Sequence, residues 1–365
     1  MQKLAFSLNK RTLLQKRAAL INRLITEIGT HSWMSQTRLS SIREIALKLG
    51  VSTATVSNAL RGTGRVSSTL AAQIRLEADR RGYVPDHTAR ALRTGKSNTI
   101  GLLVPNIGQP LFPAFAQAIE RAAKRRGLAV LIGDSQGDPH QQDFEIRTMI
   151  ARGVDALIVI PTRGTTIEPT DVPVPVAVID SAATTGNVAA SDHREGGRLI
   201  ARHLLELGHD RILILAGPEN SLVARERVGG MCEIFRQAGA EPALRYSDAT
   251  FEAGSALGHE FDLSHFTACA AAYDALAIGF AIAAGDRGYR IPDDISLTGF
   301  DDLMWAQIVS PPLTTVRQDL EAVANHALAF VAGETEASGI FPTELVVRQS
   351  TAGPSAFAKG GRHAE

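Results

Sequence analysis

Near the N-terminal end of the chain, apolar positions recur at helical spacing and predict three short helices. One stripe runs through residues 42 to 49, and Gly50 after it permits a tight turn. Ser52 can cap a second helix whose Val56 faces inward. A third amphipathic segment follows at residues 66 to 81. Three such helices can bury a small core.

The second of these helices leaves a row of short side chains pointing outward, as a helix-turn-helix requires. The outward residues are Thr53, Ala54, Ser57 and Asn58. In a helix-turn-helix the second helix enters the DNA major groove by its N-terminal end, where short polar side chains reach base edges. An ordinary helical hairpin without a role in DNA binding is the alternative, because the same geometry is common in other proteins.

From Thr99 onward, short and nearly continuous apolar runs alternate with amphipathic segments such as residues 115 to 126 and 198 to 207. This alternation predicts parallel sheets, whose strands are apolar throughout and carry functional loops at their carboxyl ends. The length of this part, about 265 residues, favours two α/β subdomains that face a cleft. The predicted strands are TIGLLVP, LAVLIGD, ALIVIP, VAVID, RILILAGP, ACAAAYD and ISLTGFDD.

Charge is distributed unevenly although the whole chain, with 38 basic and 38 acidic residues, is neutral. Residues 34 to 98 hold 11 basic and 4 acidic residues, a net charge of +7, whereas residues 99 to 365 hold 21 and 33, a net charge of -12. A basic module attached to an acidic body is the electrostatic footprint of a protein that binds nucleic acid phosphates.

The first 33 residues add 6 basic residues and 1 acidic residue. Lys10, Arg11, Lys16 and Arg17 interrupt every apolar run there, so we predict no signal peptide. Our hypothesis is that translation starts at Met34 and that the segment before it is untranslated or disordered. The alternative is a basic arm that adds nonspecific affinity for DNA.

The sequence lacks the motifs of the common enzyme classes. It has no GxSxG elbow, no phosphate-binding GxxxxGK[ST] loop and no complete dinucleotide fingerprint. The acidic pairs at 293 to 294 and 301 to 302 are adjacent on predicted strands, so they point to opposite faces and cannot flank one glycosidic bond. We therefore predict no catalytic residues, no cofactor and no enzyme activity.

Metal, redox and membrane chemistry are equally unsupported by the residues. The histidines show no HExxH spacing, so we predict no metal site. Cys232 and Cys269 suit a reducing cytoplasm, and no apolar run reaches the length of a membrane span. The tail after Gln349 lacks leucine heptads, which argues against a coiled-coil tetramer.

Seven segments together resemble the lactose and galactose repressor family from residue 41 to about 352. They are IALKLGVSTATVSNAL, GYVPD, ARAL, SDHREGGRLIARHLLELGHDRILILAGP, VARERVGGM, DDISLTGFDD and SPPLTTVRQ. The resemblance implies an all-α helix-turn-helix headpiece with a hinge helix, followed by a periplasmic-binding-protein-like core of two doubly wound parallel α/β subdomains.

The resemblance also divides the chain. It implies a headpiece at 41–84, a hinge helix at 85–97, an effector-binding core at 98–352 and a tail at 353–365, after an N-terminal extension at 1–40. The chain should cross between the subdomains near residues 207, 317 and 346. The N-subdomain then comprises 98–207 and 318–345, and the C-subdomain comprises 208–317 and 346–352.

The family's DNA-binding positions carry over residue by residue. Thr53, Ala54 and Asn58 fall at base-reading positions, and Leu92 falls on the hinge leucine that wedges into the minor groove. Asp86 stands where an asparagine is more usual, so we expect the hinge to fold less readily beside phosphate. The full predicted set is Thr53, Ala54, Thr55, Ser57, Asn58, Arg61, Ala89 and Leu92.

The resemblance also nominates residues of the cleft. Asp301 should accept hydrogen bonds from ligand hydroxyl or ring NH groups, Arg227 should contact the ligand, and Phe112 should stack on it. A structural salt bridge between Asp301 and Arg227, and a plain core role for Phe112, are the alternatives. For His193 a surface position is favoured over a role in the cleft. The full predicted set is Phe112, Asp192, Arg227, Tyr273 and Asp301.

These observations predict a cytoplasmic, nucleoid-associated transcriptional repressor that binds a palindromic operator as a homodimer. A small molecule in the cleft would control it, with a sugar or sugar derivative favoured and a purine or other metabolite second. The sequence leaves open whether this effector is an inducer or a corepressor. A secreted solute-binding protein of the periplasmic sugar-binding type is the alternative; the core alone favours it, and the headpiece opposes it.

Overall fold

The computed structural model describes residues 41–83, 95–168, 171–180 and 182–354, and it divides the chain into two compact units. The helical headpiece belongs to the first unit and the α/β core to the second, and each is described by itself. The predictions for residues 1–40, for Ala89 and Leu92 in the hinge, and for most of the tail lie outside the described residues.

The headpiece consists of the three helices that the sequence predicts, α2 (Ile42–Leu49), α3 (Thr53–Arg61) and α4 (Ser68–Arg80). Each begins at a serine whose hydroxyl accepts a backbone N–H of the first turn, and Ser52 accepts that of Thr55 at 3.0 Å. Gly50 ends α2 with a φ of 66°. The buried core comprises Ile45, Ala46, Val56, Ala59, Ile74 and Ala78.

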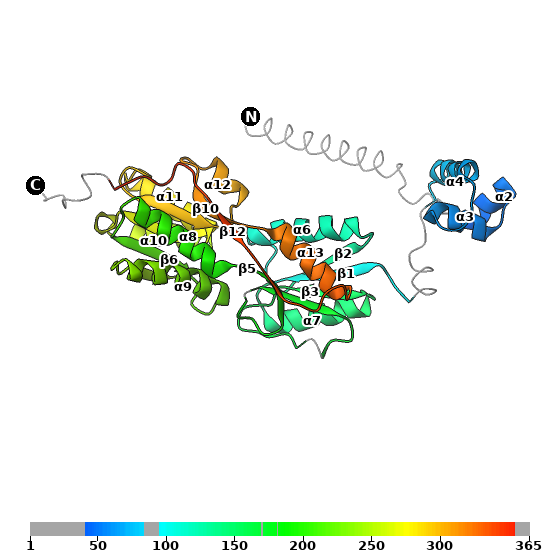
Figure 1. The fold of residues 1–365 in the computed structure, drawn as a ribbon, viewed down its shortest axis with the longest axis horizontal. Helices are drawn as coiled ribbons and strands as arrows, with labels where there is room; N and C mark the ends of the chain where they lie inside the picture. Colours follow the sequence, from blue (N-terminus) through cyan, green and yellow to red (C-terminus); the bar gives the residue numbers. More distant parts are fainter. Residues whose placement is uncertain (1–40, 84–94, 169–170, 181, 355–365) are drawn as a thin grey trace, which may run out of the picture. The chain divides into compact units, whose positions relative to one another are not determined.

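The first subdomain of the core is a six-stranded parallel sheet in the order β11-β5-β4-β3-β1-β2. Helices α6 (Leu111–Arg125) and α13 (Leu320–Val331) cover one face and α7 (Pro139–Ala151) covers the other (Figure 1). The strands are β1 (Thr99–Val104), β2 (Ala129–Asp134), β3 (Ala156–Val159), β4 (Val176–Asp180), β5 (Asn187–Ser191) and β11 (Gly339–Phe341).

The second subdomain repeats this plan with the order β12-β10-β9-β8-β6-β7, where only β12 runs antiparallel. Helices α8 (His193–Glu206) and α9 (Leu222–Gln237) pack on one face, and α10 (Phe251–Glu260) and α11 (Asp274–Asp286) on the other. The strands are β6 (Ile212–Gly217), β7 (Ala243–Tyr246), β8 (Ala268–Ala271), β9 (Ser296–Phe300), β10 (Thr314–Gln318) and β12 (Thr343–Val346); the short α12 (Met304–Ile308) follows β9.

The seven apolar runs predicted as strands are confirmed as β1, β2, β3, β4, β6, β8 and β9. Apolar runs do not predict β5, β7, β10, β11 and β12, because these short strands mix polar with apolar residues. The helices expected at 115–126 and 198–207 begin earlier, at Leu111 and His193.

The chain crosses between the two sheets at residue 192, at residue 319 and at residue 342. The crossing expected near 317 therefore lies two residues away, whereas those expected near 207 and 346 are displaced. The first displacement arises because α8 packs against α9 and the second sheet. Helical periodicity indicates a buried face but not the sheet that buries it, so residues 193–207 belong to the second subdomain.

Two glycines bring α8 and α9 into backbone contact. A Cβ on Gly197 of α8 would lie 2.0 Å from the carbonyl oxygen of Arg227, and one on Gly230 of α9 would lie 2.0 Å from that of Arg194. Neither carbonyl can move without shifting its helix. The close approach fixes the position of the Arg227 backbone relative to α8.

We predict that Gly230→Ala lowers the free energy of unfolding of the core by about 1–3 kcal/mol, the usual cost of overpacking. The matched control is Gly285→Ala in α11, where an added Cβ meets no atom within 4 Å. That variant should be stabilised by up to about 1 kcal/mol, because alanine favours a helix over glycine. Urea unfolding followed by circular dichroism measures both, and equal effects would contradict the backbone contact.

Candidate functional site

A cavity of about 340 Å³ lies between the two subdomains of the core. The first subdomain lines it with segments that follow β1, β2 and β3, with the start of α6 and with the end of β5. The second subdomain adds residues at the beginning of α9, Tyr273 before α11, and Gln318 at the end of β10. Carboxyl ends of parallel strands meet at one edge of a sheet, so the fold brings these segments together.

The lining combines aromatic and aliphatic surface with polar groups of several kinds. Phe112 and Phe115 of α6 and the ring of Tyr273 provide the aromatic part. The polar residues are Asn106, Gln109, Gln136, Thr162, Arg163, Ser191, His193, Ser221, Arg227 and Gln318. An apolar cavity with a few convergent polar groups is the usual form of a small-molecule site.

Arg227 of α9 lines the cavity, is fully buried, and donates three hydrogen bonds within the protein. Its Nη1 donates to the Ala272 carbonyl oxygen at 2.7 Å, and its Nη2 donates to Asp301 Oδ1 at 2.8 Å. Its guanidinium carbon lies 3.8 Å from the ring centroid of Phe300 and 4.7 Å from that of Tyr273. The guanidinium is therefore fixed in orientation before any ligand enters.

Asp301 lies behind this arginine rather than on the cavity wall. It follows β9 with a φ of 118°, a conformation that non-glycine residues rarely adopt. Its Oδ1 also accepts Gln318 Nε2 at 2.8 Å. Burial raises the pKa of the Asp301 carboxyl, and the facing Arg227 partly opposes this. The salt bridge weighed as the structural alternative is present, and both its cationic partner and Gln318 line the cavity.

Of the other predicted cleft residues, Phe112 and Tyr273 line the cavity and Asp192 does not. Asp192 caps α8 at the first crossing, where its carboxylate accepts the Glu195 N–H at 2.9 Å. The favoured surface position of His193 is wrong, since this side chain is buried and lines the cavity. Its Nδ1 accepts the Arg227 Nε–H at 3.4 Å.

Three residues that line the cavity were not predicted from the sequence, namely Ser191, Ser221 and Gln318. Their positions could have indicated a place in the cleft, because each residue stands at the end of a strand or the start of a helix. That signal needed strands that were not predicted, since Ser191 ends β5 and Gln318 ends β10.

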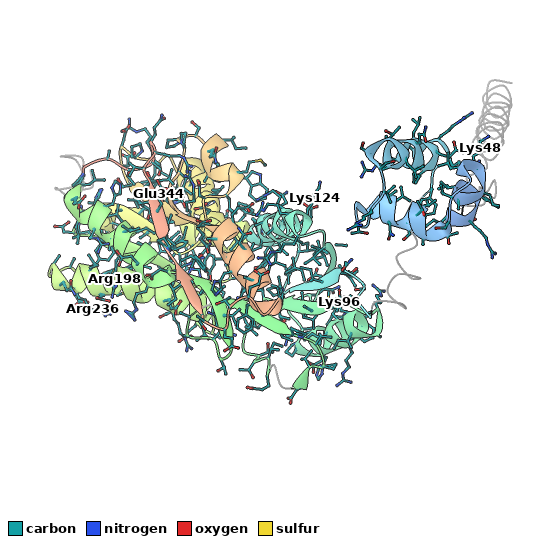
Figure 2. The ribbon with its side chains drawn as sticks, turned by 45° about the vertical axis from the view of Figure 1, so that its right-hand side comes forward. Lys48, Lys96, Lys124, Arg198, Arg236 and Glu344 are labelled. Atoms are coloured by element: carbon teal, nitrogen blue, oxygen red, sulfur yellow. The ribbon has the colours of Figure 1, made fainter. Side chains whose placement is uncertain are left out.

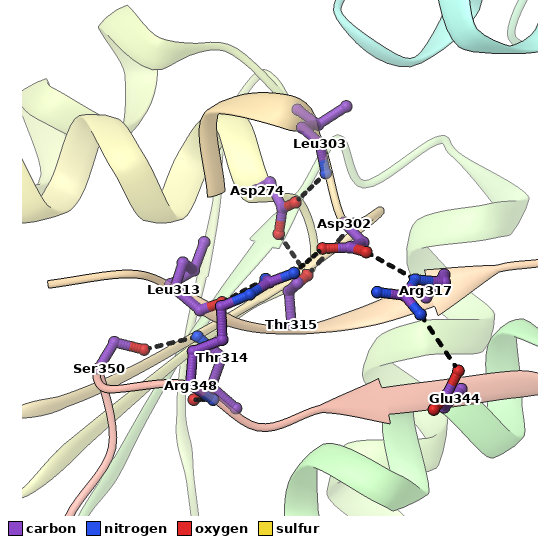
Figure 3. A network of polar contacts seen from close by, with 10 residues as sticks. All are labelled: Asp274, Asp302, Leu303, Leu313, Thr314, Thr315, Arg317, Glu344, Arg348 and Ser350. Carbon is purple, nitrogen blue, oxygen red and sulfur yellow. Dashed lines mark hydrogen bonds and ion pairs between the residues drawn. The ribbon is translucent and has the colours of Figure 1, made fainter. Parts of the chain in front are cut away.

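Asp302, the next residue after Asp301, links the end of β9 to β10 and to the segment after β12 (Figure 3). Strand β10 leads into the second crossing, and β12 follows the third. Its carboxylate accepts Arg317 Nε of β10 at 2.7 Å and Arg348 Nη2, just after β12, at 2.5 Å. Arg317 and Glu344 are paired in register between β10 and β12 and form an ion pair at 3.5 Å. The two aspartates thus join the cavity wall to the crossing strands.

A third carboxylate, Asp274, is buried beside this pair and has no arginine partner among the described residues. It accepts the Thr315 hydroxyl at 2.5 Å and the Leu303 N–H at 2.8 Å (Figure 3). Burial, and then the negative charge of Asp301, raise the pKa of Asp274 from 3.8 to about 7. The group therefore carries a proton in part at neutral pH.

In the headpiece, the predicted base-reading residues lie along α3. Thr53 and Ala54 in its first turn are exposed, and Thr55, Ser57 and Asn58 are partly exposed. The Thr55 hydroxyl shares a hydrogen bond with the capping Ser52 at 2.9 Å, and Arg61 ends the helix. Lys48 is exposed at the end of α2 (Figure 2), and the other exposed basic residues of the described headpiece are Arg43, Arg65, Arg75 and Arg80.

Neither a metal cluster nor a membrane-spanning helix is found in the described part of the chain. No three His, Cys, Asp or Glu side chains there are placed to hold a metal ion. None of the helices described is long and apolar enough to cross a membrane.

Comparison with known proteins matches the chain to a binding-protein-like domain and to a transcriptional repressor. A family profile described as a periplasmic binding protein-like domain matches residues 201–351. The HTH-type transcriptional repressor CytR of Escherichia coli is 30% identical over 333 residues, which cover 87% of this chain and 97% of that repressor.

Two solved structures extend the comparison. The lac repressor dimer bound to operator and the anti-inducer ONPF matches with a TM-score of 0.73 and 26% identity, over 86% of this chain and 99% of that one. A periplasmic binding protein/LacI transcriptional regulator from Alkaliphilus metalliredigens, complexed with D-xylulofuranose, matches with a TM-score of 0.63 and 25% identity, over 70% and 99%.

We predict that Asp274→Asn flattens the dependence of stability on pH. Between about pH 4 and pH 7 the folded protein keeps a proton on Asp274 that the unfolded chain has lost, so the free energy of unfolding falls as the pH rises. The variant cannot titrate there. The difference between the two proteins should change by on the order of 2 kcal/mol between about pH 5 and pH 7.

Urea unfolding at several pH values measures this difference. Asp286→Asn, which removes an exposed carboxylate at the opposite end of α11, is the control and should follow the unsubstituted protein. Parallel curves for the unsubstituted protein and Asp274→Asn would show that Asp274 is ionised throughout, against this account.

Proposed function

Because the chain belongs to the lactose and galactose repressor family of transcriptional regulators, we propose that it is a repressor whose DNA binding is controlled by a small molecule in the core cavity. It would bind a near-palindromic operator as a homodimer, in the cytoplasm and on the nucleoid. The observation that carries this proposal is the Arg227–Asp301 ion pair, because it joins the cavity wall to the crossing strands.

The headpiece supports the DNA half of the proposal. The first turn of α3 presents Thr53 and Ala54 to solvent, and base edges are the natural partners of short side chains on a recognition helix. Thr55, Ser57, Asn58 and Arg61 would contribute further base and phosphate contacts. We keep as predictions that Ala89 packs in the hinge and that Leu92 wedges into the minor groove.

The cavity supports the effector half. Phe112 and Tyr273 offer rings against which the apolar face of a sugar can pack, and Arg227 and Gln318 offer fixed donors. A relative binds D-xylulofuranose, so we favour a sugar or sugar derivative over a purine or another metabolite. We propose no catalytic activity.

The proposed coupling runs through the two aspartates after β9. A ligand that accepts hydrogen bonds from Arg227 or Gln318 would change the hydrogen bonds that these side chains donate to Asp301. The next residue, Asp302, accepts hydrogen bonds from Arg317 and Arg348 of the crossing segments. Closing of the cleft would then reorient the subdomains. The hinge at 85–97 would shift between an ordered and a disordered state, which is a two-state switch.

An apolar surface on the second subdomain fits the dimer. Ile282 of α11 and Met304 and Ile308 of α12 are exposed to 59%, 70% and 71%. A groove beside them is lined by Ile278, Ala281, Ile282, Gly285, Tyr289, Arg290, Ile291, Val309, Ser310 and Pro311. Exposed apolar surface of this kind marks an interaction site, and a homodimer needs one that serves both copies.

A solute-binding protein without a DNA role is the alternative function, favoured by the core taken alone. The headpiece discriminates between the two, since a solute-binding protein has no use for a basic three-helix unit with an exposed recognition helix.

We predict that Thr53→Ala weakens binding to the preferred operator about tenfold and relaxes the base preference at one position of each half-site, because one base contact is lost. The control is Thr69→Ala, which changes another exposed threonine in α4, off the recognition helix. Selection from a random duplex library, followed by titration, measures both variants. A Thr53 variant with unchanged affinity and base preference would remove α3 from the interface.

We predict that Ile282→Asp converts the dimer to a monomer at micromolar concentration, because two carboxylates would be buried at a self-complementary interface. Ile340→Asp places the same charge at an isoleucine that is 60% exposed on β11 and should remain a dimer. Sedimentation velocity distinguishes the two states. A dimeric Ile282 variant would move the interface elsewhere.

A further inference from the structure

Charge is unbalanced among the described side chains that line the cavity. Among the described residues that line it, Arg163 and Arg227 are the charged groups apart from His193, and no carboxylate is present. Arg227 is neutralised from behind by Asp301, whereas Arg163 forms no hydrogen bond or ion pair with any described residue. The described part of the wall therefore presents one positive charge without a described partner to whatever fills the cavity.

A buried hydroxyl of the same subdomain also lacks a partner among the described residues. The Ser191 side chain is 3% exposed and lines the cavity, yet its Oγ has no hydrogen-bond partner among the described residues. Leaving such a group unpaired is costly, so a ligand atom that comes within hydrogen-bond distance of it is favoured. A hydroxyl can donate to an oxyanion as readily as to a neutral oxygen.

The start of α6 reinforces the positive character of this wall. Leu111 is the first residue of this 15-residue helix and lines the cavity, and the capping position, Pro110, supplies no side-chain acceptor. The N-terminus of a helix carries a partial positive charge that stabilises anions within its first turn. Arg163, Leu111 and Ser191 all belong to the first subdomain.

We propose that the effector is an anionic monosaccharide derivative, either a sugar acid or a sugar phosphate. This inference rests on the proposed function and narrows its ligand class. The anionic group meets Arg163 and the start of α6, a ligand oxygen accepts from Ser191, and the ring packs on Phe112. The volume of about 340 Å³ is near the lower end of the range for small-molecule sites and fits one sugar ring rather than an oligosaccharide.

The test uses the full chain and matched ligand sets built on one carbon skeleton. Glucose, gluconate and glucose 6-phosphate form one set, and ribose, ribonate and ribose 5-phosphate form another. Calorimetric titration gives each Kd. An anionic member should bind about tenfold or more tightly than its neutral partner, the effect of one charge-assisted contact, and this advantage should shrink as salt is added. The carboxylate and phosphate arms identify which group is recognised.

Arg163→Gln should bring the Kd of the anionic ligand close to that of its neutral partner and leave the neutral Kd unchanged. Arg147→Gln is the matched control, because it removes an exposed arginine of α7 that does not line the cavity. Ser191→Ala should weaken the preferred ligand several-fold without abolishing its preference for the anionic member.

Two outcomes would overturn the proposal. A neutral member that binds as tightly as its anionic partners, with no effect of Arg163→Gln, excludes the anionic class but leaves the effector-controlled repressor intact. Failure of every member to bind also rejects the class; operator binding, measured on the same sample, then shows separately whether the DNA half of the proposed function stands.

Discussion

The buried ion pair between Arg227 and Asp301 is the interaction on which the arrangement of the core depends. It places opposite charges 2.8 Å apart in a region that water does not reach, and removal of either partner would leave the other uncompensated. Such a loss costs about 3–5 kcal/mol, a large part of the stability of a domain. The close helix contacts at Gly197 and Gly230 fix the position of Arg227 relative to α8. The positive φ of Asp301 directs its carboxylate toward Arg227.

Around this pair, three aspartates divide their roles according to their partners. Asp301 serves the cavity through Arg227 and Gln318, Asp302 holds the crossing strands through two arginines, and Asp274 accepts only neutral donors. All three lie within a few residues of the end of β9 or contact that segment. In the proposed coupling, these directional bonds would transmit a small shift at the cavity wall to the crossings, as a bistable hinge requires.

Much of this arrangement was predictable from the sequence. Continuous apolar runs identified the central strands, and serines before amphipathic segments identified the headpiece helices with their caps. The strands with mixed composition were not predictable in this way, because β5 and β10 are defined by pairing with distant strands rather than by local pattern. The resemblance assigned Asp192 to the cleft and a surface position was favoured for His193, whereas the end of β5 places His193 on the cavity wall and Asp192 at the cap of α8. Resemblance brought Arg227 and Asp301 together, but only the fold shows that the arginine faces the cavity and the aspartate stands behind it.

The most direct test of ligand-controlled repression is a linked titration. The full chain is titrated with an operator duplex obtained by selection, with and without a saturating amount of the small molecule that binds the core. The account predicts that the Kd for the operator changes at least about tenfold, and that the operator changes the Kd for the ligand by the same factor, as thermodynamic linkage demands. A ligand that binds the core tightly and leaves the operator Kd unchanged would contradict it.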